Sequence, residues 1–150
     1  MNRYGRLLRC AVLAGSAAAV LAGCGMPPMT AGMSAFRGAM SAGNEVPPNG
    51  STGSGVAEAW LDKGSNLLKW RVTYTGLSGP ATMAHFHGPA LPGANAGVTL
   101  PFANPASPIE GQAVITPAQA ADLVAGKWYA NIHTAAFPAG EIRGQLVPAL

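Results

Sequence analysis

Short runs of alternating apolar and polar residues, separated by turns rich in glycine and proline, most constrain the fold of this 150-residue chain. In the clearest run, Leu68, Trp70, Val72 and Tyr74 alternate with polar residues, which is typical of a strand with one buried face. A turn-rich cluster precedes this run, so we expect a hairpin partner at 56–61. Further strands are expected at 35–41, 81–87, 97–102, 109–115, 127–134 and 141–147.

One segment has the pattern of a helix instead. Thr116 offers an N-cap, Pro117 the first helical position and Gln119 the partner of a capping box, and Gly126 offers a stop. We therefore expect one short helix over about residues 117–125. Many strands with a single helix predict an all-β fold, an antiparallel Greek-key-like β-sandwich or flattened barrel.

The N-terminus carries a targeting signal. Three arginines precede an apolar run at 11–22, which is too short to span a bilayer. The run ends in Leu-Ala-Gly-Cys24, which resembles a bacterial lipobox. This resemblance implies a lipoprotein signal peptide at 1–23 and lipidation of Cys24, so that the protein is exported and lipid-anchored in the bacterial cell envelope. The alternative is an ordinary signal peptide cut at another position.

Removal of the signal peptide changes the net charge of the chain and the number of its cysteines. The formal charge of +3 comes from its three arginines, and six basic and six acidic residues remain. We therefore expect no nucleic-acid partner. Cys10 lies in the signal and Cys24 would carry lipid, so no disulfide is expected. The rest suffices for one domain at 35–150, preceded by a flexible tether at 24–34 that is rich in proline, glycine and methionine.

All three histidines lie in two motifs, ATMAHFHGPA with His85 and His87, and NIHTAAFPAGEIRGQL with His133. In a strand, His85 and His87 point to one face about 7 Å apart, and Met83 continues that face. His133 shares the polar side of its own strand with Asn131. Three imidazoles on adjacent strands would suit copper or zinc with an open fourth position. Alternatively, these histidines only hydrogen-bond turn carbonyls, and His133 holds the loop that follows it.

Glu141 and Arg143 are the other candidate site residues. Their spacing of two places them on one strand face, where they are expected to form an ion pair that closes the turn. Alternatively, Arg143 guides an anion. No catalytic residue is predicted, because no order of residues typical of a nucleophile, a phosphate loop or a paired acid and base occurs.

Most of the chain after the tether resembles the CHRD domain, a module named after chordin and also found in bacterial secreted proteins. The blocks that carry the resemblance are NEVPP at 44–48, GSGVAEAWL at 53–61, LLKWRVTYTGLSGP at 67–80, AHFHGPA at 84–90 and PAQAADLVAGKWYANIHTAAFPAGEIRGQL at 117–146. The resemblance implies a binding or interaction module. It names no reaction, and it leaves a protein or a glycan open as partner beside the membrane.

The order of the histidine motifs is also similar to that of the copper,zinc superoxide dismutases. In that family, the residues matching His85, His87 and His133 bind copper, and the residue matching Arg143 guides the anion. This chain has no fourth histidine to bridge copper and zinc, no separate zinc cluster and no disulfide, which excludes a binuclear site. Three classes remain: a binding module that holds copper or zinc, which we favour, a divergent dismutase-like oxidoreductase, and a purely structural surface module.

Overall fold

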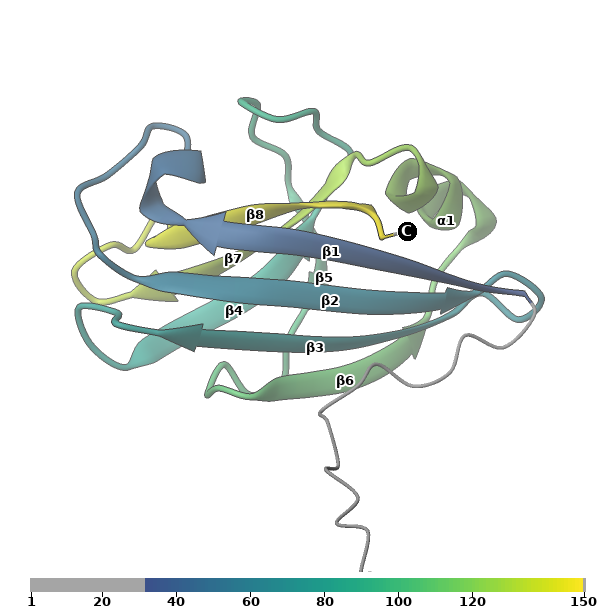
Figure 1. The fold of residues 1–150 in the computed structure, drawn as a ribbon, viewed down its shortest axis with the longest axis horizontal. Helices are drawn as coiled ribbons and strands as arrows, with labels where there is room; N and C mark the ends of the chain where they lie inside the picture. Colours follow the sequence, from purple (N-terminus) through teal and green to yellow (C-terminus); the bar gives the residue numbers. More distant parts are fainter. Residues whose placement is uncertain (1–31, 150) are drawn as a thin grey trace, which may run out of the picture.

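A computed structural model describes residues 32–149 (Figure 1). The predicted signal peptide, Cys24 and all of the predicted tether before residue 32 lie outside the described residues. Within the described part, no helix has the length and apolar character needed to cross a membrane.

The chain forms one antiparallel sheet of eight strands in the order β5-β4-β7-β8-β1-β2-β3-β6. The sheet curls into a half-barrel, with β4, β5 and β7 behind β1, β2 and β3 in Figure 1. This confirms the expected all-β fold with one short helix. The strands are β1 Met33–Ser41, β2 Ser54–Asp62, β3 Leu67–Thr75, β4 Ala81–His87, β5 Val98–Pro101, β6 Ile109–Val114, β7 Trp128–Thr134 and β8 Ile142–Pro148.

Element boundaries agree with the sequence pattern to within two residues. β1 begins at Met33, not at residue 35, because Met33 and Ser34 pair with Asp62 and Leu61. The end of the predicted tether therefore belongs to the sheet. The helix α1 spans Pro117–Val124 and begins with the expected capping box between Thr116 and Gln119. A single turn of 3-10 helix, η1 (Ala42–Asn44), follows β1.

The core lies inside the curl, where aromatic rings join strands that are far apart in the sheet. Trp70 on β3 contacts Phe86 on β4 at 5.8 Å between ring centroids, and Phe102 at 5.5 Å. Phe86 also contacts Trp128 on β7 at 5.9 Å. The buried residues of β3 are Leu68, Trp70 and Val72, as its alternation predicts. Burial of these rings stabilises the curled arrangement of the sheet.

The strand β7 lies inside the sheet between β4 and β8, and all seven of its residues are buried. Its apolar face points into the core. Its polar face, with Asn131 and His133, is also buried, at 4% and 6% exposure. The alternation identifies the polar face correctly but does not show that loops cover it. That covered face is where the histidine motifs meet.

Candidate metal centre

The two histidine motifs come together across β4 and β7. β4 pairs with β7 so that Met83 lies opposite His133 and His85 lies opposite Asn131. One ring nitrogen from each of His85, His87 and His133 lies within 4.8 Å of the other two. Nitrogens that share a tetrahedral zinc ion lie about 3.3 Å apart for bonds of about 2.0 Å. The separations between these nitrogens must therefore shorten by at most about 1.5 Å for all three to bind one ion.

Backbone carbonyls fix which nitrogens are free. His87 Nδ1 lies 3.0 Å from the carbonyl oxygen of Ala96, and His133 Nδ1 lies 3.0 Å from that of Pro138. A carbonyl only accepts, so each Nδ1 carries the proton and each Nε2 keeps a lone pair when the ring is neutral. Metal-binding histidines usually have this arrangement, with one nitrogen donating to the protein and the other facing the ion.

His85 completes the cluster from its more open side. Its Nδ1 lies 3.2 Å from His133 Nε2, and its ring is half-buried whereas His87 and His133 are buried. Burial, and then repulsion from His133 and His87, lowers the pKa of His85 to about 4. Burial also lowers the pKa of His133. Both rings are therefore neutral and hold free lone pairs at pH 7, which is the state that binds a metal.

A family model for the CHRD domain matches residues 36–146. The chain belongs to the CHRD domain family. Comparisons with curated proteins and with solved structures find no match. The match includes at least part of every strand of the sheet and all three histidines, so the cluster is part of the CHRD domain itself.

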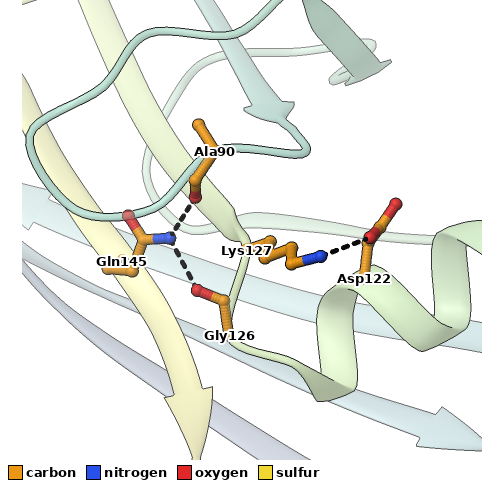
Figure 2. Close-up of polar contacts among 5 residues, drawn as sticks. All are labelled: Ala90, Asp122, Gly126, Lys127 and Gln145. Carbon is orange, nitrogen blue, oxygen red and sulfur yellow. Dashed lines mark hydrogen bonds and ion pairs between the residues drawn. The ribbon is translucent and has the colours of Figure 1, made fainter.

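In this CHRD domain, the loop at residues 88–97, which we call the covering loop, lies next to the cluster. Ala96 accepts from His87, and Ala96 also exchanges hydrogen bonds with the Tyr129 hydroxyl. At the other end of the loop, Gln145 Nε2 donates to the carbonyls of Ala90 and Gly126, at 2.9 and 2.7 Å (Figure 2). The ion pair between Lys127 and Asp122 lies beside this contact (Figure 2). These bonds hold the loop that orients His87.

Arg143 is buried at 2% exposure and holds the same loop. Its guanidinium donates to Asn95 Oδ1 at 3.0 Å and to the carbonyl of Ala94 at 2.8 Å. It also lies 3.4 Å from the centre of the Tyr129 ring, on which His87 stacks in parallel. These contacts favour a structural role for Arg143 over the guidance of an anion.

The ion pair expected between Glu141 and Arg143 is not formed among the described residues. Glu141 precedes the first residue of β8, Ile142, so the two side chains do not share a strand face. Glu141 is completely buried and instead accepts hydrogen bonds from Ser51, Ser78 and Thr134. The prediction of an ion pair between Glu141 and Arg143 was therefore wrong.

Asn131 is the important neighbour that was not among the predicted site residues. Its Oδ1 lies 2.9 Å from His87 Nε2 and 3.0 Å from His133 Nε2. Alternation along β7 places Asn131 on the polar face with His133, so the sequence alone could have identified it as a neighbour of that histidine. Its closeness to His87 depends on the pairing of β4 with β7, which the local pattern does not determine.

Proposed function

We propose that this protein is a CHRD binding module, anchored in the cell envelope, that holds a copper or zinc ion through His85, His87 and His133. One observation carries the proposal: three ring nitrogens converge, and in two of the rings the other nitrogen donates a hydrogen bond to a backbone carbonyl. Imidazole is a good ligand for both metals. The fixed tautomers of His87 and His133 and the lowered pKa values of His85 and His133 favour binding near neutral pH.

Binding is favoured over a dismutase-like reaction because of Arg143. An arginine that guides an anion needs a free, accessible guanidinium, whereas this one is buried and bonded to the covering loop. The purely structural alternative draws on the same two carbonyl contacts. In that alternative His85 serves only to form a hydrogen bond with His133 Nε2, whereas metal binding uses all three imidazoles.

The arrangement of the sheet also suits an anchored module. His85, Asn131, Arg143 and Ser41 lie in one row across four strands. Ser41 ends β1, and Met33, eight residues earlier, begins it. At about 3.3 Å per residue, the histidines lie about 26 Å along the sheet from the entry of the chain. A lipid on Cys24 would thus hold the domain at the end away from the histidines, which leaves them available to metal or to a protein or glycan partner.

Metal content tests this function. The full-length protein, purified without a histidine tag, is stripped with a chelator, reloaded with copper or zinc, desalted and measured by elemental analysis. We expect about one ion per chain in the wild type. His85→Ala and His87→Ala should both lose most of it. Because His85 is half-buried, its variant should keep the fold, as circular dichroism will check.

Lys69→Ala is the matched control, since Lys69 is exposed on β3 outside the cluster. It should bind as much metal as the wild type. Equal metal in the wild type and in both histidine variants would contradict the proposal.

A further inference from the structure

Asn131 lies next to the Nε2 atoms of the two buried histidines, His87 and His133. It occupies the centre of β7, is 4% exposed, and lies opposite His85 on β4. Its Oδ1 is 2.9 Å from His87 Nε2 and 3.0 Å from His133 Nε2. The same His133 Nε2 is 3.2 Å from His85 Nδ1. One amide oxygen and three ring nitrogens therefore surround one small region.

These buried atoms lack a donor hydrogen between them, which is unusual for polar atoms at hydrogen-bonding distance. Each Nδ1 of His87 and His133 donates to a carbonyl, so the Nε2 atoms have no proton to offer when the rings are neutral. An amide oxygen is also only an acceptor. Three acceptors that face one another repel, and this repulsion is costly in a buried site. A metal cation between them turns each lone pair into a ligand bond.

We propose that Asn131 supplies the fourth ligand of the metal centre through Oδ1, beside His85, His87 and His133. This inference rests on the proposed function and adds to it a residue and a coordination number. Four ligands around copper or zinc at about 2.0 Å have six edges of about 3.3 Å, and the observed separations of 2.9, 3.0 and 3.2 Å are close to three of these edges. An amide oxygen is a weaker ligand than imidazole, and such oxygens occur as weak axial ligands of copper.

A competing arrangement uses the same atoms. If the Asn131 amide is turned, its NH2 group donates one hydrogen to each Nε2 and holds the two rings without a metal. In that arrangement the amide would compete with a metal for both lone pairs. The two arrangements therefore predict opposite effects of removing the amide.

Copper affinity, measured by competition with a chelator, separates them in the full-length protein. If Asn131 is a ligand, Asn131→Ala lowers the affinity about tenfold and changes the electron paramagnetic resonance spectrum of bound Cu(II). Asn131→Asp keeps the shape and adds charge to the oxygen, so it should raise the affinity. Asn104→Ala is the control, since Asn104 is an exposed loop residue whose side chain accepts from the Ala106 backbone.

The outcomes separate the two proposals. Unchanged or increased affinity in Asn131→Ala, with an unchanged spectrum, overturns the role of Asn131 while leaving the histidine site intact if His85→Ala still loses metal. A wild type that binds no metal overturns both. Because Asn131→Asp is nearly isosteric, it keeps the test valid if the alanine variant unfolds.

Discussion

The carboxylate of Glu141 joins three loops at the end of the sheet that holds the histidines. It accepts from Ser51 Oγ at 2.6 Å, from Ser78 N and Oγ at 2.7 Å each, and from Thr134 Oγ1. Burial raises the pKa of Glu141, but the hydrogen bonds from Ser51, Thr134 and Ser78 outweigh it and hold that pKa below its usual range. A completely buried carboxylate with this many donors is a structural centre.

We therefore expect Glu141→Ala to lower the free energy of unfolding by about 3 kcal/mol, since it leaves buried donors without an acceptor. Urea denaturation measures this change. Glu58→Ala is the control, because Glu58 belongs to an exposed ion pair with Arg37 and should cost less than about 1 kcal/mol. Equal losses in the two variants would mean that the Glu141 network contributes no more than a surface pair.

Glu45 is a second buried carboxyl, and it behaves in the opposite way. It is 6% exposed, and burial raises its pKa to about 7 against the attraction of Arg143 and a hydrogen bond from the Val46 backbone. The folded state therefore binds the proton more tightly than the unfolded state, whose pKa is 4.5. The contribution of Glu45 to stability is complete below pH 4.5 and is lost as pH rises through about 7.

Glu45→Gln removes this loss because it keeps the shape and cannot ionise. Compared with the wild type, the variant should be about equally stable at pH 4.5 and about 2–3 kcal/mol more stable at pH 8. Urea denaturation at the two pH values gives the difference directly. Comparing variant with wild type also cancels the titration of His85 and His133, whose lowered pKa values act in the opposite direction. A difference that does not change with pH would refute this account of Glu45.

At the scale of the elements, the contact between β1 and β8 depends on a missing side chain. A Cβ atom on Gly144 would lie 2.8 Å from the carbonyl oxygen of Ala39 and 2.8 Å from Met40 Cγ. Gly144→Ala must therefore push these two strands apart, and we expect it to cost about 2 kcal/mol in thermal or urea denaturation. Gly50→Ala is the matched control, since nothing lies within 4 Å of its Cβ position. The expectation fails if both variants unfold at the same midpoint.

The elements could be predicted from the sequence because their signals are local. The alternation of Leu68, Trp70 and Val72 and the cap at Thr116 each act within a few residues, and the structure confirms both. The convergence of His85 with His133 depends on the pairing of β4 with β7 across 48 residues, so it could only be proposed. The two histidine motifs were assigned to one site because of their resemblance to known families, and not because of hydrophobic periodicity.

Other contacts in and near the site could not be predicted from the residue types. The acceptors that orient His87 and His133 are backbone carbonyls, which every residue carries. The partners of Glu141 are the hydroxyls of Ser51 and Ser78, in two loops, and of Thr134, at the end of β7, and these replaced the expected ion pair with Arg143. The placement of the loops determines both sets of contacts, and that placement depends on the whole fold.

At the scale of the whole molecule, the proposed anchor gives a simple prediction. Cys24→Ala should move the protein from the membrane fraction to the soluble fraction of a bacterial host, because the acyl chains that hold it would be absent. Cys10→Ala is the control, since Cys10 lies within the proposed signal peptide, and it should stay with the membrane. Immunoblots of the two fractions measure the outcome. Membrane retention of the Cys24 variant would remove the lipid anchor from the account.

The proposed function requires one metal ion to bind where β4 and β7 bring the three histidines together. A crystal structure of the zinc-loaded full-length protein, with anomalous data collected at the zinc edge, would locate this ion. We predict one strong anomalous peak about 2.1 Å from His85 Nδ1, His87 Nε2 and His133 Nε2. A strongest peak elsewhere, or a peak that contacts only one of these nitrogens, would contradict the claim.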